Sequence, residues 1–214
     1  MSKYESLALD ILERHSAVVR NNHFVYTGGD HGSAYVNKTA VTPHARDMHF
    51  LCGYLCKEAL YLKPDIVLGA VVVGAIMAQE VAFAFVRNTF DECMPRALFA
   101  DKEGDQLVIK RGFDKYFKGA RVLIVEDIVN TGKTVKALVA LAQKYGGIVV
   151  GVSAICNCGP TTASDLGEGI VFNPLVTMQT DVFPENDCPF CRVGIPVNTE
   201  LGHGAAFVAR TKNN

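Results

Sequence analysis

Apolar and polar residues follow two different rhythms along the chain, and these rhythms divide it into predicted helices and strands. Apolar residues recur every three or four positions over residues 2–15, 48–59 and 134–145, which is the spacing of amphipathic helices. Short continuous apolar runs predict buried strands instead. The clearest are RVLIV at residues 121–125 and IVVGVSAIC at residues 148–156.

Three further segments complete the predicted fold. Residues 64–86 give an apolar strand, a tight glycine-flanked loop and a helix, and RALFA at residues 96–100 gives another short strand. Residues 23–39 read as two short strands joined by a glycine-rich turn. The fold class expected is α/β, with a mainly parallel twisted sheet, helices on both faces, and ligands at the carboxyl ends of the strands. The charged segment 101–119 is expected to form a mobile hairpin or flap.

Composition narrows the class of protein. With 214 residues the chain is expected to form one domain, and its formal net charge of -1 argues against a protein that wraps nucleic acid on a basic face. The longest apolar run, residues 66–78, is shorter than the roughly 18 residues of a membrane span. The first fifteen residues lack the pattern of a secretory signal, so we expect a soluble protein of the cytosol.

The cysteines predict packing more than chemistry. Seven is an odd number, and their spacing suggests no disulfide scaffold. Cys52 and Cys56 lie one helical turn apart among apolar residues, as buried thiols do. Cys188 and Cys191 have the spacing of metal ligands, but a zinc site needs two more ligands, for which His203 is one candidate. We expect a tail-packing or incidental redox role for this pair, with a structural metal or a disulfide as the alternative, and we predict no certain metal site.

The stretch VLIVEDIVNTGKT, residues 122–134, carries the strongest chemical signal. Its end resembles a Walker A motif, but Asp127 stands where that motif requires its first glycine, and a carboxylate would repel a triphosphate. The turn still favours a phosphate, because a loop that opens a helix presents unpaired N–H groups and the positive end of the helix dipole. Thr131 and Thr134 add hydroxyl donors.

Two carboxylates precede this turn. Glu126 and Asp127, at the end of a predicted strand, can accept hydrogen bonds from the vicinal hydroxyls of a sugar. A phosphate and a cis-diol together describe a ribose 5-phosphate, and a pyrophosphate on its C1 would bring Mg²⁺ with it. The alternative is an exposed acidic pair that caps the following helix.

The same stretch resembles the phosphoribosyl pyrophosphate signature of type I phosphoribosyltransferases. The resemblance covers nearly the whole chain and narrows to the orotate phosphoribosyltransferase family. HFVYTGGDHGSAYVNK is similar to the N-terminal segment of that family, PDIVLGAVVVGAIMAQEVA to its pyrophosphate loop and helix, and LFADKEGDQLVIKRGF to its mobile catalytic loop. FPENDCPFCRVGIPV resembles the tail of a bacterial and archaeal subgroup.

The resemblance implies a pentosyltransferase of pyrimidine nucleotide biosynthesis, which transfers ribose 5-phosphate to a base nitrogen, releases pyrophosphate and uses Mg²⁺. It implies a homodimer with loop exchange, a core of residues 41–179, and a hood on the base side formed by residues 1–40 with residues 180–214. The residues it marks as catalytic are Asp127, Glu126, Lys102, Lys110 and Arg111, with Mg²⁺ held mainly by the substrate near the two acids. The residues it marks as substrate-binding are Asn130, Thr131, Gly132, Lys133, Thr134, Thr27, Gly28, Lys38, Val73, Gly74 and Cys158.

The sequence departs from the family pattern mainly on the base side. The strand after the signature helix usually ends in Asp-Arg, where the arginine binds the orotate carboxylate, but the matching residues here are Asn157 and Cys158. Asn130 replaces a threonine, and Lys133 replaces a glycine. Lys38 or Arg192 could supply the missing charge. Two alternative functions therefore stay open. The protein could transfer the ribose 5-phosphate to another nucleobase, or it could be a regulator that binds phosphoribosyl pyrophosphate without catalysis.

Overall fold

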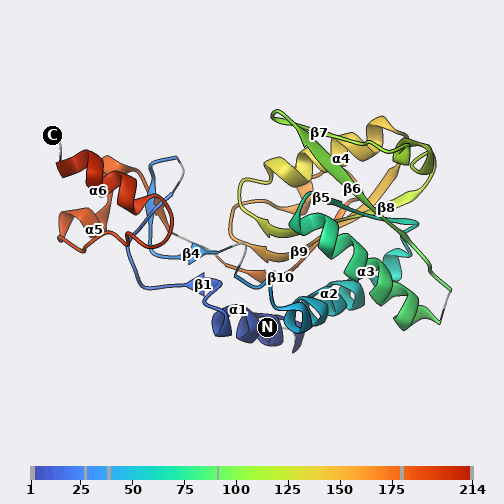
Figure 1. Ribbon diagram of the computed structural model, residues 1–214, viewed down its shortest axis with the longest axis horizontal. Coiled ribbons are helices and arrows are strands. Elements are labelled where there is room, and N and C mark those ends of the chain that lie inside the picture. The colour runs from blue at the N-terminus through green and yellow to red at the C-terminus, as the bar shows by residue number, and fades with distance from the viewer. Residues whose placement is uncertain (1–2, 27, 38–39, 91, 179–180, 213–214) are drawn as a thin grey trace. The chain divides into compact units, whose positions relative to one another are not determined.

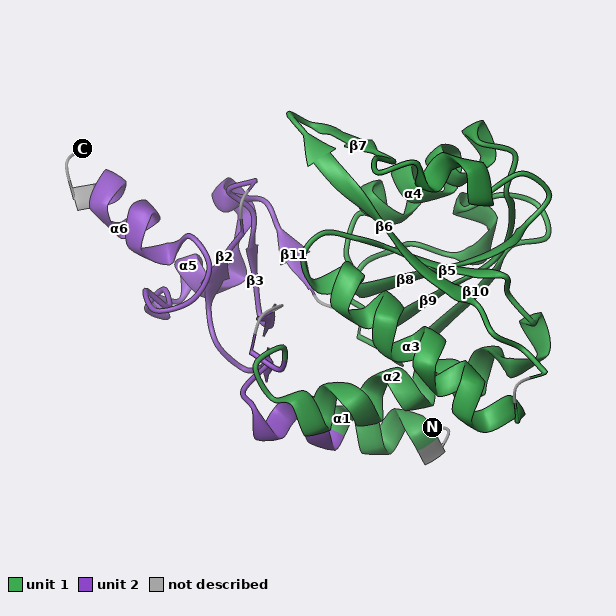
Figure 2. Ribbon diagram, turned by 45° about the vertical axis from the view of Figure 1, so that its right-hand side comes forward, with its two compact units in different colours: residues 1–9, 42–178 green, residues 10–41, 179–214 purple. Residues whose placement is uncertain are grey.

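The computed structural model describes residues 3–26, 28–37, 40–90, 92–178 and 181–212. The chain separates into two compact units (Figure 2). Unit 1 consists of residues 1–9 and 42–178, and unit 2 consists of residues 10–41 and 179–214.

Unit 1 is built on a six-stranded sheet with the order β10-β9-β8-β5-β6-β7 (Figure 1). Neighbouring strands are parallel except for β7, which pairs with β6 in an antiparallel hairpin at the edge. The strands are β5 (Ile66–Ala70), β6 (Arg96–Glu103), β7 (Gln106–Val108), β8 (Arg121–Val129), β9 (Ile148–Asn157) and β10 (Val171–Thr177).

The order of the strands places a topological switch between β5 and β8. From β5 the chain continues to β6 on one side, whereas β8 is followed by β9 and β10 on the other side. The loops that leave β5 and β8 therefore diverge at the carboxyl edge of the sheet. In open α/β sheets this is where ligands bind.

Helices cover both faces of the sheet, with α2 and α3 on one face and α4 on the other (Figure 1). One continuous core packs the α4 side, because Ile66, Leu68, Val122 and Ile124 alternate inward from the strands and meet the apolar row of α4. The helices of the chain are α1 (Lys3–Arg14), α2 (Ala45–Ala59), α3 (Val73–Thr89), α4 (Lys133–Lys144), α5 (Pro189–Arg192) and α6 (Gly204–Lys212). Short 3₁₀ turns are η1 (Leu60–Leu62), η2 (Phe113–Tyr116), η3 (Ala163–Asp165) and η4 (Glu185–Asp187).

The α/β fold class expected from the sequence is confirmed, and the differences are local. The β8 strand continues through both acidic residues to Val129, and α4 begins at Lys133 instead of Thr134. Gly146 follows α4 with a φ of 82°, a conformation that glycine adopts without strain at a helix end. The charged segment after residue 100 forms the β6–β7 hairpin.

Unit 2 contains two small sheets. In the three-stranded sheet, β3 (His31–Gly32) lies between β2 (Phe24–Val25) and β11 (Val182–Phe183), so it joins the two ends of the chain. In the other sheet, β1 (Val18–Val19) pairs with β4 (Tyr35–Val36). Among the described residues, no helix combines the length and the apolar character needed to cross a membrane.

Candidate functional site

The acidic pair lies within the last part of β8. Asp127 is buried, with 7% of its surface exposed, and Glu126 is half-buried. The backbone N–H of Asp127 donates to Glu126 Oε1 (3.3 Å), and that of Ile128 donates to Asp127 Oδ1 (2.6 Å). Because each carboxylate accepts from the residue that follows it, both side chains lean toward the carboxyl end of the strand. Two negative charges are thereby directed to the edge where the sheet order switches.

The turn after β8 ends at Gly132, which has a φ of 73° and precedes the first residue of α4. No side chain among the described residues caps this helix, and its first turn contains no acidic residue. Lys133 instead places a cation at the positive end of the helix dipole, which is unfavourable unless an anion binds there. The side chains of the turn are exposed: Asn130, Thr131, Lys133 and Thr134. The geometry is that of an anion site formed by backbone N–H groups.

The turn after β9 packs against the turn at residues 130–134, which is called the phosphate turn below after its predicted ligand. The N–H of Cys158 donates to the carbonyl of Val129 (2.8 Å). A Cβ atom added to Gly159 would lie 1.8 Å from the carbonyl oxygen of Asn130, so only glycine permits this approach. Thr161 Oγ1 donates to the same carbonyl at 3.5 Å. Sequence reasoning missed Gly159 and Thr161, because neither stands in the signature motif.

The loop after β5 makes a second close approach at the same edge. A Cβ atom on Gly69 would lie 2.0 Å from the carbonyl oxygen of Gly74, which is buried. The peptide bond between Val71 and Val72 is cis, and Val72 is 73% exposed. Val73 begins α3, and no side chain among the described residues caps this helix either. Two helix N-termini, those of α3 and α4, therefore flank the switch point.

The base-side position after β9 carries a buried thiol. Cys158 is 9% exposed, and its Sγ lies 3.2 Å from that of Cys156. Asn157 turns its amide inward, donating from Nδ2 to the carbonyl of Thr161 (3.0 Å). The position where the family resemblance predicts a cation for the orotate carboxylate is thus occupied by a buried cysteine. Arg192, one of the two candidates to supply the charge, lies in unit 2 and pairs with Asp187 at 3.2 Å.

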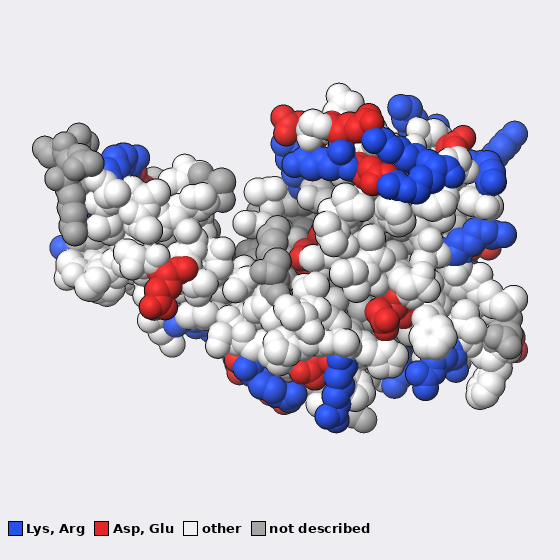
Figure 3. All heavy atoms as spheres, in the orientation of Figure 1, with Lys and Arg blue, Asp and Glu red and all other residues white. Residues whose placement is uncertain are grey.

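Of the basic residues predicted to be catalytic, Lys102 lies in β6, and Lys110 and Arg111 follow shortly after β7. Lys102 is exposed and pairs in register with Leu107. Lys110 Nζ lies 2.6 Å from Glu103 Oε1, while Arg111 forms an ion pair with Asp101 and stacks over Phe99. Figure 3 shows Lys and Arg side chains, mixed with acidic ones, gathered on the edge of unit 1 where the β6–β7 hairpin lies. Lys110 and Arg111 are thus held by carboxylates of β6.

The remaining predicted substrate residues belong to unit 2. Gly28 is exposed in the turn between β2 and β3, whereas Thr27 and Lys38 lie outside the described residues. Within unit 1, the acidic pair, the turn at residues 130–134 and the start of α3 lie at the carboxyl ends of β5 and β8, whereas the predicted basic residues lie in and after the β6–β7 hairpin. The site residues of the predicted hood do not share that unit.

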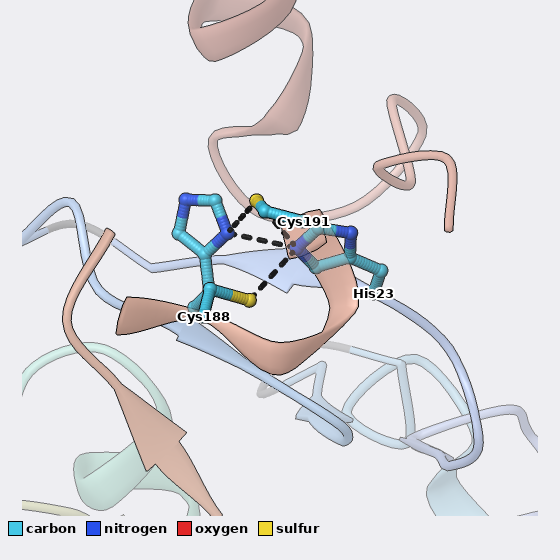
Figure 4. A group of neighbouring side chains, drawn as sticks. His23, Cys188 and Cys191 are labelled. Atoms are coloured by element: carbon cyan, nitrogen blue, oxygen red, sulfur yellow. Dashed lines mark hydrogen bonds between the residues drawn. The ribbon is translucent and has the colours of Figure 1, made fainter. Parts of the chain in front are cut away.

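A second cluster in unit 2 was not expected. His23, His31, Cys188 and Cys191 direct one ligand atom each toward a common point, and all four atoms lie within 4.8 Å of one another (Figure 4). His203, the candidate third ligand, is not in this group. Burial lowers the pKa of His31, and burial raises that of Cys191. The two histidines lie at least 157 residues from the cysteines, so no short motif could reveal the group.

Comparison with known proteins matches the sequence of this chain to one family. The family described as the phosphoribosyl transferase domain matches residues 58–167, which contain the β5 loop, the hairpin and the phosphate turn. The orotate phosphoribosyltransferase of Caldanaerobacter subterraneus is 31% identical over 189 residues, covering 88% of this chain and 93% of the relative.

Solved structures show the same fold. The crystal structure of orotate phosphoribosyltransferase from Aeropyrum pernix superposes with a TM-score of 0.62 at 19% identity, covering 80% of this chain and 93% of that one. Adenine phosphoribosyl transferase from Trypanosoma brucei has a TM-score of 0.56 at 15% identity, covering 83% and 82%. By its sequence match along most of its length, the chain belongs to the phosphoribosyltransferases and, within them, to the orotate phosphoribosyltransferase family.

Proposed function

We propose that this protein transfers ribose 5-phosphate from phosphoribosyl pyrophosphate to orotate, giving orotidine 5'-monophosphate and pyrophosphate. The observation that carries the proposal is the junction of β8 and α4. There a pair of carboxylates, Glu126 and Asp127, is followed, after the end of β8 and a short turn, by an uncapped helix N-terminus at the switch point of the sheet. The first suits the ribose hydroxyls, and the second suits the 5-phosphate.

The phosphate turn binds the donor before any chemistry occurs. The N–H groups of residues 131–134 and the hydroxyls of Thr131 and Thr134 donate to the 5-phosphate, and Lys133 adds a positive charge. Asp127 and Glu126 accept hydrogen bonds from the ribose hydroxyls. With both ends of the sugar held, its C1 has a fixed position relative to the incoming base, which removes much of the entropic cost of the reaction.

The hairpin then stabilises the leaving group. Negative charge grows on the departing pyrophosphate, so Lys102, Lys110 and Arg111 stabilise the transition state more than the ground state. Two of these cations are held by Glu103 and Asp101. Asp101 is mostly buried, but the Lys110–Glu103 pair is largely solvent-exposed, and such a pair contributes only about 0–1 kcal/mol. Replacement of Glu103 by a pyrophosphate oxygen as the partner of Lys110 therefore costs little free energy. Closure of the hairpin also excludes water from the donor.

The donor set of the site fits Mg²⁺. Glu126 and Asp127 offer carboxylate oxygens, which this hard cation prefers, and both lean toward the edge of the sheet. We propose that they lie near a cation held mainly by the substrate. When bound, Mg²⁺ neutralises charge on the pyrophosphate.

We further propose that the hairpin acts across a homodimer. Unit 1 exposes large apolar side chains on two helices that pack on each other: Phe50 of α2, and Ile76 and Phe83 of α3, each 41–49% exposed. Such a surface favours a second copy of the chain as partner. We also propose that residues 10–41 and 179–214 form the base-side hood and that the protein works in the cytosol, where thiols such as Cys52 and Cys93 stay reduced.

A mixture of two inactive variants tests the exchange of hairpins. Lys102→Ala removes a hairpin cation, and Asp127→Asn removes a ribose contact. If each hairpin serves the partner's site, random reassortment restores about one quarter of wild-type activity, since half of the dimers are mixed and each mixed dimer has one intact site. A mixture as inactive as its components would show that each hairpin serves its own subunit.

One observation favours a second candidate function, the transfer to a different base. The position expected to bind the orotate carboxylate carries the buried thiol of Cys158, and loss of a charged hydrogen-bonding partner costs about 2–5 kcal/mol. A base without a carboxylate would avoid that loss. The fold accommodates such bases, since the adenine enzyme of Trypanosoma brucei shares it.

Release of pyrophosphate decides between these candidates. The protein is incubated with phosphoribosyl pyrophosphate and Mg²⁺, in parallel with orotate, uracil, adenine, hypoxanthine and guanine, with Asp127→Asn as the matched control. Release with orotate alone supports the proposal. Release with another base alone reassigns the acceptor, and saturable donor binding without any release would replace the enzyme by a regulator.

A further inference from the structure

Four side chains of unit 2 converge in a way that the transferase reaction does not explain. His23 immediately precedes β2, and His31 lies in β3. Cys188 and Cys191 bracket the first turn of α5, so their Sγ atoms project from one short helix start. His23, His31 and Cys188 are at most 1% exposed, whereas Cys191 lies at the surface. We propose that these four residues bind a structural zinc ion.

The distances suit a tetrahedral site. His23 Nε2 lies 2.7 Å from His31 Nδ1, 3.5 Å from Cys188 Sγ and 3.8 Å from Cys191 Sγ. Cys191 Sγ lies 3.4 Å from His31 Nδ1. With zinc bonds of about 2.0 Å to nitrogen and 2.3 Å to sulfur, ligand atoms in a tetrahedron are about 3.3–3.8 Å apart. Among these four pairs, the two nitrogens must separate by about half an ångström to receive the ion, and all four ligand atoms lie within 4.8 Å of one another.

A second contact orients one ligand. The Nδ1 atom of His23 lies 2.8 Å from the carbonyl oxygen of Ile195. A carbonyl only accepts hydrogen bonds, so Nδ1 donates to it, and a zinc ion would bind the lone pair of Nε2 on the cluster side. Fixing the tautomer through the far nitrogen is the usual support of a metal-bound histidine.

A disulfide between the two cysteines accounts for less of the geometry. Cys188 and Cys191 are free thiols, and a bond between them would leave two buried imidazole rings with facing nitrogens. A cation bound by all four groups satisfies them together. Two thiolates and two imidazoles in tetrahedral array favour zinc over the harder Mg²⁺, which selects oxygen ligands.

The site has a clear structural use. Its ligands come from residues 10–41 and from residues 179–214, whose strands are only two residues long. Such a small unit has little core of its own, and a metal that bridges its two segments supplies folding free energy. The two histidines also lie on either side of the segment that contains β2 and the turn with Gly28. The ion is thus expected to hold the shape of that turn, whichever base the enzyme accepts.

Metal analysis of the full chain tests the proposal. The protein is produced without a histidine tag, dialysed against a weak chelator and examined by inductively coupled plasma mass spectrometry. We expect about one zinc per chain in the wild type and in Cys93→Ser, whose thiol lies in unit 1, but less than about a tenth in Cys191→Ser. Cys191→His keeps a ligand at the same place and should retain the ion.

Cobalt substitution keeps the test independent of folding yield and of enzymatic activity. Wild-type protein loaded with Co²⁺ should show the intense visible bands of a tetrahedral ion and a thiolate charge-transfer band, which His31→Gln weakens. Two results would overturn the proposal: zinc content that stays the same in Cys191→Ser, or wild-type protein that takes up neither metal while peptide mapping finds Cys188 joined to Cys191. Neither readout depends on which base is accepted, so failure of the zinc site and failure of the proposed reaction are distinguishable.

Discussion

Replacing Gly159 by alanine should distort the phosphate turn, although Gly159 itself lies in the neighbouring turn after β9. The added Cβ would lie 1.8 Å from the carbonyl oxygen and 2.6 Å from the carbonyl carbon of Asn130. Real Cβ contacts are essentially never shorter than 3.0 Å, so the two turns must separate by about 1.2 Å. The hydrogen bond from Cys158 to Val129 opposes that movement.

The expected magnitude follows from this displacement. Overpacking of this kind costs about 1–3 kcal/mol of stability. A shift of about 1 Å in groups that position the substrate lowers turnover by up to about 100-fold. We therefore expect Gly159→Ala to lower kcat/KM for phosphoribosyl pyrophosphate by about 10- to 100-fold and to lower Tm.

The same substitution at Gly53 is the matched control. Gly53 lies within α2, and a Cβ atom there meets nothing within 4 Å. Alanine should therefore raise stability by up to about 1 kcal/mol and leave the kinetics unchanged. Pyrophosphate release and thermal unfolding are measured for both variants. Wild-type kinetics in Gly159→Ala would refute the reasoning that this turn positions the phosphate site.

Four further predictions test the site and the core. Asp127→Asn should lower kcat/KM by about 100-fold with little change in the circular dichroism spectrum, and unchanged turnover would remove Asp127 from the ribose site. Leu138→Ala, at a fully buried position of α4, should lower the free energy of unfolding in urea by about 2–5 kcal/mol, and a loss below 1 kcal/mol would contradict its place in the core. Burial raises the pKa of Cys52 and raises that of Cys56 to about 12, so neither thiol should react with a disulfide reagent at pH 8 until urea unfolds the chain. Because the folded state keeps these protons where the unfolded chain loses them, their contribution to stability is complete below pH 9 and is lost as the pH rises toward about 12, which urea titrations at several pH values would detect.

The sequence determined the features of this protein that depend on neighbours along the chain. The run VLIV, the two acids and the Thr-Gly turn lie within thirteen residues, and local preferences alone make them a strand, a turn and a helix. The alternation of strands and helices likewise fixed the α/β class. Even here the ends of the elements shifted, because pairing with β9 carries β8 on to Val129.

Only the tertiary structure decided which distant residues meet. Gly159 matters because the ends of β8 and β9 lie side by side, and nothing in its own neighbourhood reveals Asn130 as its contact. The four side chains of the proposed zinc site provide the clearest case. CPFC contains two potential ligands, and the nearest histidine that follows in sequence is His203, whereas the pairing of β11 with β3 brings His23 and His31 to the cysteines from the other end of the chain. Metal ligands need proximity in space, and strand pairing creates that proximity between residues at any separation in sequence.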